Sequence, residues 1–340
     1  MINRALLATA GGLIAFAAAQ PAAAQDVTLT FAHFWPAVSS THTDLFEAWA
    51  NRVAEESDGR IAVEIYPSAA LAAPPAQYEA VISGIADMTA TVLGYTANRF
   101  PLSQVVELPG ISHNAAHGSC ILQGLYDEGL LDSEFEDTHP LFLFTHGPGH
   151  IHTTDVLVQE PSDLAGLRIR RPTTVVASLL ESLGAQPVGM PAPESYTAMQ
   201  RGVIDGVALP WEGAFVFRLN ELANNHTEVG GLYTLAFVVT MNRDVYEGMP
   251  EDLRAVIDGN TGEEWSQTAA SVFDALDVRG RADAVERGHT IYTVEGGIEN
   301  PAWQPLLQGA AEAYIADLES QGLPGQAVYD RALELAATCE

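Results

Sequence analysis

The sequence contains no lysine: all 15 basic residues are arginine, against 44 Asp and Glu, and the formal net charge is -29 at pH 7. Without lysine, a Schiff-base nucleophile and a phosphate loop of the Gly-x-x-x-x-Gly-Lys type are excluded. A negative field of this size also repels nucleic acid and anionic lipid. We therefore expect no nucleic acid as a partner. An anionic ligand would have to be held by a local, desolvated arginine.

Other motifs of catalysis are missing as well. The sequence has no Gly-x-Ser-x-Gly elbow and no His-Glu-x-x-His zinc helix. The acidic pairs Glu134/Glu136 and Glu263/Glu264 lie in polar runs that are typical of a solvated surface. The sequence therefore predicts a protein that is not an enzyme and uses no cofactor, with a periplasmic hydrolase as a weaker alternative.

Long apolar runs are confined to the N-terminus. One basic residue, Arg4, precedes an uncharged run from Ala5 to Ala19 and a small-residue site that ends at Ala24. This pattern predicts a secretory signal peptide that is cleaved after Ala24 and a mature chain located in the periplasm. No later stretch reaches the roughly 20 apolar residues of a transmembrane helix, so we expect no membrane insertion of the mature chain.

Cysteine is scarce, with only Cys120 and Cys339 in 340 residues. In an oxidising compartment such a pair can form a disulfide, which here would tie the C-terminal tail to the first half of the chain. Two thiols of unknown separation in space do not decide between a disulfide and two free cysteines. Both alternatives stay open from the sequence.

An internal repeat indicates the architecture. The motif Tyr-x-Ala-x-x-x-Gly-(Ile/Val)-x-Asp occurs at residues 78–87 and again at residues 196–205. Each copy is typical of a helix that stops at glycine and turns into a short strand. Near the N-terminus, the strand patterns Val27–Ala32 and Ile61–Tyr66 flank the helical pattern Thr43–Ser57, which predicts a parallel α/β sheet. Two similar α/β lobes follow.

The C-terminal third is predicted to be helical. Apolar residues recur at helical intervals from Pro250 to Ala284, where glycines allow one or two long helices that bridge the lobes. Two more helices are expected over Trp303–Ser320 and Gln326–Ala337.

Histidines offer one candidate site. His113 and His117 are one helical turn apart, and His146, His150 and His152 cluster within seven residues. Imidazole is a common zinc ligand, so a periplasmic metal-binding protein that uses His146, His150 and His152 is the alternative function. The intervening Gly-Pro-Gly is typical of a loop, which fixes ligands poorly.

A second candidate site lies in the basic segment 166–172, Gly-Leu-Arg-Ile-Arg-Arg-Pro. Strand alternation places Arg168 and Arg170 on one face and Arg171 on the other. A guanidinium at the C-terminal end of a strand lies where open α/β sheets bind ligands, and it can hold a carboxylate with two hydrogen bonds. Taken alone, the segment is equally compatible with surface ion pairs for all three arginines.

Five motifs, in this order along the chain, resemble a known family. They are Gly-Leu-Arg-Ile-Arg at 166–170, Leu-Gly-Ala-Gln-Pro-Val at 183–188, Met-Pro at 190–191, the repeat copy at 196–206 and the segment 242–253 with Met-Pro-Glu-Asp-Leu. Together they look like the extracytoplasmic solute-binding subunit of TRAP transporters, the DctP-type family, over essentially the whole mature chain.

This resemblance implies a two-lobed periplasmic binding protein fold, type II-like, with crossing strands and a long lobe-spanning helix. It implies capture of a small organic acid by domain closure, with the carboxylate on Arg170, and delivery to a small and a large membrane subunit. A ligand-sensing module of the same fold is the remaining alternative. The expected divisions are a signal peptide at 1–24, lobe I at 25–150 plus about 237–277, lobe II at 151–236 plus about 278–305, and C-terminal helices at 306–340 packed on lobe I.

The resemblance also indicates the ligand. Leu209 stands where dicarboxylate members often have Asn, and Trp211 follows. We therefore expect a monocarboxylate with an apolar or aromatic tail. No metal ligand is predicted, and Asp87 and Asp205 are interpreted as structural. The predicted ligand-binding residues are Arg170, Trp211, Glu212, Phe34, Trp35, Tyr95, His146 and Phe215.

Overall fold

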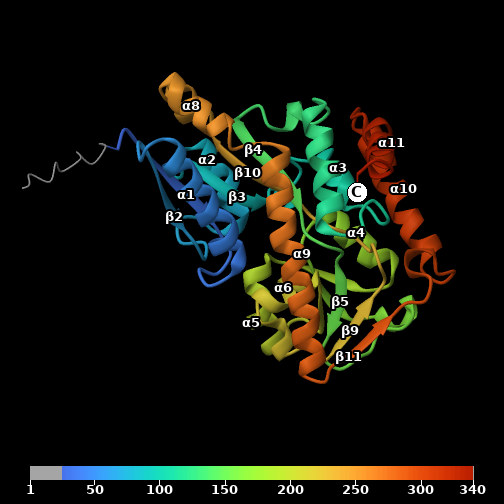
Figure 1. Ribbon diagram of the computed structural model, residues 1–340. Helices are drawn as coiled ribbons and strands as arrows, with labels where there is room; N and C mark the ends of the chain where they lie inside the picture. The colour runs from blue at the N-terminus through green and yellow to red at the C-terminus, as the bar shows by residue number, and fades with distance from the viewer. Residues whose placement is uncertain (1–24, 340) are drawn as a thin grey trace, which may run out of the picture.

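A computed structural model describes residues 25–339, so the predicted signal peptide and its cleavage site lie outside the described residues. The chain folds around two β-sheets, with helices packed against each and one long helix running beside both (Figure 1). This is the two-sheet α/β fold expected from the sequence.

The first sheet has five strands in the order β2-β1-β3-β10-β4. Strand β1 pairs in parallel with β2 and β3, whereas β10 is antiparallel to both β3 and β4. The two residues that follow β1, Phe34 and Trp35, therefore reach the same edge of the sheet as the end of β3. The strand bounds are β1 Val27–His33, β2 Ile61–Tyr66, β3 Met88–Val92, β4 Thr138–Thr145 and β10 Ala236–Asn242.

The second sheet has six strands in the order β11-β9-β5-β8-β6-β7. Strand β6 pairs in parallel with β7 and β8, and β5 is antiparallel to β8 and β9. The arrangement β7-β6-β8-β5 repeats β2-β1-β3-β10 of the first sheet. The bounds are β5 His150–Thr153, β6 Arg168–Arg171, β7 Gln186–Gly189, β8 Gly206–Leu209, β9 Asn225–Glu228 and β11 Thr290–Thr293.

The repeated motif has the same structure in both sheets. Its helices are α2 (Gln77–Ile82) and α5 (Ser195–Gln200), and each is followed by a glycine in the left-handed region, Gly84 at φ 71° and Gly202 at φ 66°. A side chain there would strain the turn, which explains the repeated glycine. The duplication inferred from the sequence is confirmed.

The repeated aspartates hold the two sheets in the same way. Asp87 Oδ2 accepts a hydrogen bond from the Thr30 backbone N–H at 2.7 Å, and Asp205 Oδ2 accepts one from the Arg168 backbone N–H at 2.9 Å. Each carboxylate thus ties the start of one parallel strand to the central strand beside it. Both residues are structural, as the sequence interpretation held.

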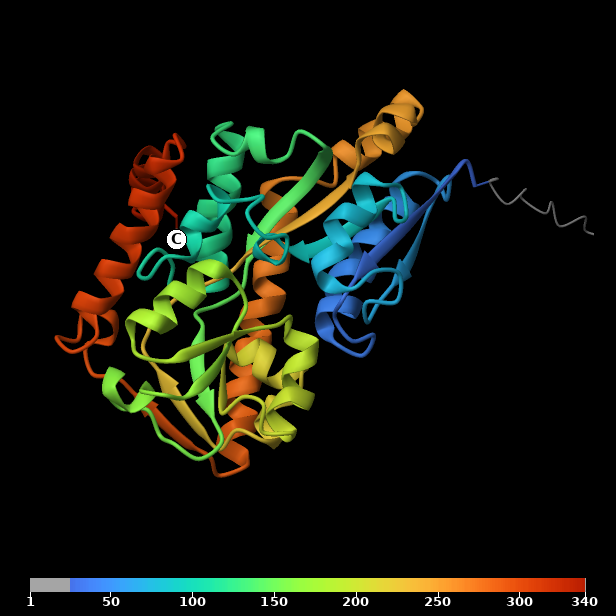
Figure 2. The ribbon, with the colours of Figure 1, turned by 180° about the vertical axis from the view of Figure 1, so that it is seen from behind.

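The chain crosses between the sheets more than once. It passes from β4 to β5, returns from β9 to β10, and crosses again through α9 (Glu263–Glu286), the long helix that runs along both sheets (Figures 1 and 2). Gly280 of α9 allows the start of α6 to approach, since a Cβ there would lie 2.2 Å from the Trp211 carbonyl oxygen. The expected lobe-spanning helix is present.

The other helices agree with the helical patterns. The single pattern over Pro250–Ala284 forms two helices, broken between Gly259 and Gly262. Near the C-terminus, α11 packs against α3 and α10 against α4. The lobe boundaries, including the placement of residues 306–340, stay predictions. The remaining bounds are α1 Glu47–Glu56, α3 Ala115–Asp127, α4 Thr174–Ser182, α6 Trp211–Val216, α7 Arg243–Gly248, α8 Glu251–Asp258, α10 Gln304–Ser320 and α11 Gly325–Ala336.

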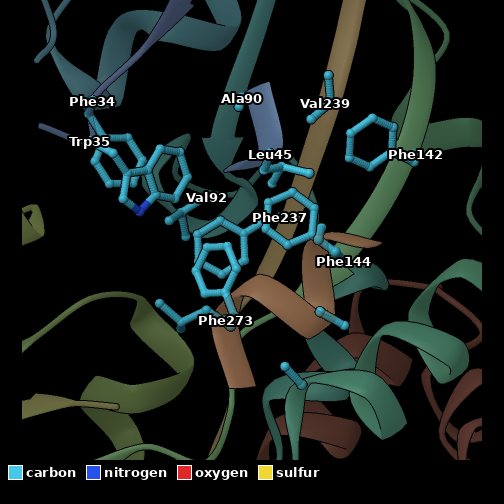
Figure 3. Packing of buried hydrophobic residues seen from close by; sticks show 14 of the residues in the cluster. Phe34, Trp35, Leu45, Ala90, Val92, Phe142, Phe144, Phe237, Val239 and Phe273 are labelled. Carbon is cyan, nitrogen blue, oxygen red and sulfur yellow. The ribbon is translucent and has the colours of Figure 1, made fainter. Parts of the chain in front are cut away.

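An aromatic cluster lies where the first sheet meets α9 (Figure 3). Phe237 of β10 stacks on Phe144 of β4 with ring centroids 4.9 Å apart, and it lies 5.7 Å from Phe273 of α9 and 5.8 Å from Trp35. All four side chains are buried. Such ring pairs add about 0.5 to 1.5 kcal/mol beyond the area they bury, so this packing holds the crossing strands and α9 in one arrangement.

Among the described helices, we find none with the length and apolar character required to cross a bilayer.

The two cysteines are paired. Cys120 of α3 and Cys339, which follows α11, form a disulfide with a Cα–Cα distance of 5.9 Å across 219 positions of sequence. The bond fastens the C-terminal helix to the helix that covers β4. Of the two alternatives that the sequence left open, a disulfide or two free cysteines, the structure shows the disulfide.

Removing this crosslink should destabilise the protein. Because the bond closes a long loop, the variant with Cys120→Ser and Cys339→Ser should unfold with a free energy about 2 to 4 kcal/mol lower. Urea denaturation of oxidised parent and variant measures the difference, with dithiothreitol-treated parent as the matched control. Equal midpoints for oxidised parent, reduced parent and variant would contradict the prediction.

Candidate functional site

Arg170 lies on β6 with its side chain fully buried. Its Nε donates to the Met190 carbonyl oxygen at 2.9 Å, one terminal nitrogen to the Ala208 carbonyl oxygen at 3.0 Å, and the other to the Tyr95 hydroxyl at 3.1 Å. These contacts hold the guanidinium group from the residue after β7, from β8 and from the turn that follows β3 of the other sheet.

The charge of Arg170 has no anionic partner in the described chain. The three hydrogen bonds use three of the five guanidinium N–H groups, and each goes to a neutral oxygen. Burying an ion without a counter-ion costs several kcal/mol, and an anion supplied from outside removes much of this cost. Two free N–H groups and an uncompensated charge are what a carboxylate needs to bind with two hydrogen bonds.

The neighbouring arginines are engaged differently. Arg168 forms a two-point ion pair with Asp205, with distances of 2.9 Å and 2.6 Å, and is partly exposed. The Arg171 guanidinium covers Gly189, where an added Cβ would lie 2.8 Å from it. The surface-pair alternative thus describes Arg168 and does not describe the buried Arg170.

A narrow cavity lies at Arg170, where the C-terminal ends of the parallel strands of both sheets meet. In this closed arrangement the cavity has a volume of about 20 Å3, enough for about one water molecule, so a larger solute enters only when the lining side chains move apart. The lining residues are Phe34, Trp35, Val92, Tyr95, His146, Arg170, Ala192, Leu209, Pro210, Glu212, Gly213, Phe217, Leu235 and Phe237.

Six of the eight residues predicted to bind ligand line this cavity: Phe34, Trp35, Tyr95, His146, Arg170 and Glu212. The other two, Trp211 and Phe215, do not. Trp211 turns toward the second sheet, where its indole N–H donates to Glu228 Oε1 at 3.0 Å. Phe215 lies under the Arg279 guanidinium, 4.7 Å from the ring centroid, beside a separate groove.

The aromatic wall expected at Trp211 is formed by other residues. Phe217 and Phe237 line the cavity, and Phe34 stacks on Trp35 with ring centroids 3.9 Å apart. Sequence reasoning missed Phe217 and Phe237. The apolar run around Phe237 signals a buried strand, but no local pattern shows that this strand faces a ligand cavity. Leu209, the basis for expecting an apolar tail, does line it.

Two groups form hydrogen bonds between the halves of the molecule, and one of them, Tyr95, lines the cavity. Tyr95 follows β3 of the first sheet. Its hydroxyl oxygen accepts hydrogen bonds from two groups of the second half, the Arg170 guanidinium and the Ala192 backbone N–H, the latter at 3.0 Å. Thr173, at the N-terminus of α4, donates to Glu107 Oε2 of the first half at 2.7 Å. The structure is therefore a closed arrangement in which hydrogen bonds cross between the sheets.

Glu212 and His146 are the other buried polar groups of the cavity, 3% and 2% exposed. Burial raises the pKa of Glu212 to about 8, helped by the charge of Asp277 and opposed by the Trp35 indole. Burial lowers the pKa of His146 to about 3, and the positive charge of Arg170 acts in the same direction. Both side chains are therefore neutral near pH 7.

The histidines do not converge on a metal. His146 Nδ1 is bonded to the Gly147 carbonyl oxygen, and His152 is hydrogen-bonded to His226 at 2.7 Å and to the Leu209 carbonyl oxygen at 3.0 Å. Within residues 25–339, no group of three or more His, Cys, Asp or Glu side chains is arranged to hold a metal ion. The alternative of a metal site at His146, His150 and His152 thus finds no geometric support.

Two α/β sheets with crossing strands, and a buried free cation in the cavity between them, define a binding protein for a small anionic solute. Residues 31–314 match the model of bacterial extracellular solute-binding protein family 7, DctP. The chain belongs to this family, which is periplasmic and binds solutes without catalysing a reaction, as the resemblance implied.

Solved structures of similar proteins share the fold. A TRAP solute-binding protein from Rhodoferax ferrireducens T118, in complex with copurified benzoate, is 37% identical, with a TM-score of 0.87 over 92% of this chain and 98% of that one. A marine metagenome TRAP protein described as specific for aromatic acid ligands, with bound 3-hydroxybenzoate, is 35% identical, with a TM-score of 0.86 over 93% and 100%. The C4-dicarboxylate-binding periplasmic protein DctP of Rhodobacter capsulatus is 26% identical over 90% of this chain and 92% of its own.

The buried carboxyl groups predict how stability depends on pH. Burial raises the pKa of Glu107 and Asp277 to about 7 and that of Glu212 to about 8. An acid with a raised pKa stabilises the fold at low pH, and this contribution is lost as pH rises through the folded pKa. Buried histidines with lowered pKa, such as His146 and His150, act oppositely but only below about pH 6.5.

Between pH 6.5 and 8.5 the unfolding free energy should therefore fall. Glu212→Gln should reduce this fall by up to about 1.4 kcal/mol per pH unit, because the amide does not titrate. Urea denaturation at both pH values measures the slope, and Glu286→Gln, an exposed position on α9, is the control. A slope that is the same in the parent and Glu212→Gln would contradict the prediction.

Proposed function

We propose that this protein captures an aromatic monocarboxylate for a TRAP transporter. The main support is the buried Arg170 guanidinium, which lines an aromatic cavity with two free N–H groups and no anionic partner in the described chain. The aromatic side chains Phe34, Trp35 and Phe217 can pack against the ring of the ligand. Leu209 adds an apolar contact and offers no hydrogen bond to a second carboxylate. The relatives that bind benzoate and 3-hydroxybenzoate support this class of ligand.

Capture proceeds by closure of the two halves. The ligand carboxylate binds Arg170 in the second half while its ring contacts Phe34 and Trp35 of the first half. A ligand that contacts both halves favours the closed form by its differential affinity for the two forms. The closed form adds the contact of Tyr95 with Arg170 in the cavity and the contact of Thr173 with Glu107 between the halves.

The proposal includes delivery of the acid to the membrane. The periplasmic protein hands the acid to the small and the large membrane subunit, and the mature chain itself begins after cleavage at Ala24. The family match and the predicted signal peptide support these steps.

Arg170→Met tests the capture residue. The variant should bind benzoate at least a hundredfold more weakly, a loss of about 3 kcal/mol, because the methionine side chain supplies neither charge nor hydrogen bonds. Without ligand it should be as stable as the parent or more so, since a buried charge is removed. Calorimetry and thermal unfolding measure the two effects.

Arg168→Gln is the matched control, because Arg168 is paired with Asp205 outside the cavity. It should bind benzoate as the parent does. Thermal stabilisation of Arg170→Met by benzoate to the same extent as the parent would overturn the site, and failure of the parent to respond to any aromatic acid would overturn the function.

Tyr95→Phe tests the contact between the halves. The change removes one hydroxyl and leaves the Ala192 N–H and one Arg170 N–H without partners. Benzoate affinity should fall by roughly tenfold, mainly through faster dissociation, because the closed form loses about 1 to 3 kcal/mol. Stopped-flow kinetics measure both rate constants, and an unchanged dissociation rate would speak against this role.

A further inference from the structure

The cavity contains two buried polar atoms without a partner, apart from the free N–H groups of Arg170. Among residues 25–339, neither His146 Nε2 nor Glu212 Oε1 forms a hydrogen bond. Both side chains line the same cavity. A buried polar atom that stays unpaired costs about as much as a lost hydrogen bond, so native structures retain few of them without a reason.

The surroundings of His146 determine what its free nitrogen can do. Thr234 Oγ1 donates to the His146 carbonyl oxygen at 2.6 Å, and the Gly147 carbonyl oxygen beside Nδ1 is an acceptor. The ring proton is therefore on Nδ1, and Nε2 has a lone pair. Because burial and the charge of Arg170 keep the ring neutral, Nε2 is an acceptor that requires a donor.

Glu212 has complementary properties. Its backbone N–H donates to Asp277 Oδ1 at 2.6 Å, which holds the start of α6 against α9 and places a carboxylate near the side chain. With its raised pKa, the carboxyl group is protonated near pH 7 and can both donate and accept one hydrogen bond.

The chemistry of these two atoms distinguishes the possible substituents of a ligand. A second carboxylate has no proton for His146 Nε2 and would leave that nitrogen unpaired. A methyl group would leave both atoms unpaired. A hydroxyl group can both donate to His146 Nε2 and accept from the Glu212 carboxyl group, so its chemistry matches both atoms.

From this geometry we infer that His146 and Glu212 form a hydroxyl subsite, and that the preferred ligand is a hydroxylated aromatic monocarboxylate. The inference rests on the proposed function and goes further than the comparisons, since one similar protein binds benzoate and another binds 3-hydroxybenzoate. Arg170 holds the carboxylate, and the two polar side chains select the ring substituent.

The test is calorimetry of the parent at pH 7 with benzoate, the three hydroxybenzoate isomers and the three methylbenzoates of similar size. One hydroxybenzoate should bind roughly tenfold to a hundredfold more tightly than benzoate and than the methylbenzoate of the same substitution pattern. If benzoate or that methylbenzoate binds as tightly as the best hydroxybenzoate, the subsite is overturned while the proposed function stands. If no aromatic acid binds, the function and the subsite both fail.

Variants assign the preference to residues. His146→Phe and Glu212→Leu should each bring the ratio of the benzoate and hydroxybenzoate Kd values close to one. Glu212→Gln, which keeps one donor and one acceptor, should retain most of the preference. A preference that survives both His146→Phe and Glu212→Leu would overturn the assignment, and Glu212→Gln remains informative if Glu212→Leu fails to fold.

Discussion

The burial of one guanidinium without a counter-ion is the constraint around which the rest of the structure is arranged. Arg170 is held by carbonyl oxygens of two neighbouring segments and by a hydroxyl from the opposite sheet, so its position depends on both halves. Dipoles of this kind stabilise a charge only in part, and the two remaining N–H groups point to an anion as the missing partner. The cavity, the strand ends and the hydroxyl of Tyr95 all surround this guanidinium group.

The two halves share one architecture but differ at the position of the buried charge. In each half an aspartate is bonded to the backbone of the central parallel strand, at Thr30 in β1 and at Arg168 in β6. Two residues further along, the equivalent positions are Ala32 and Arg170. The same backbone frame therefore offers an apolar surface on one side and a cation on the other. This asymmetry suits a solute with one carboxylate and one apolar end.

Much of this was accessible from the sequence because it depends on local patterns. Repeated glycine turns, strand alternation and ordered motifs predicted the two sheets and singled out Arg170. The orientation of individual side chains was not accessible. Trp211 turns away from the cavity, and its indole N–H donates to Glu228 on β9. Phe237 lines the cavity because it lies at the start of β10, where the chain enters the first sheet after leaving β9 of the second. Both facts depend on strand order, which no local pattern encodes.

The strong negative charge of the protein limits how it can distinguish between anionic ligands. With a net charge of -29 for the full sequence, the long-range field does not attract an anion. The attraction of Arg170 is felt at short range, in an apolar enclosure where water screens it little. The protein therefore distinguishes between ligands mainly when its two halves close, because the loss of water then makes an unpaired polar atom costly. Under that condition a single hydroxyl group on the ligand can decide which aromatic acid the protein retains, because only a hydroxylated ring forms hydrogen bonds with His146 and Glu212.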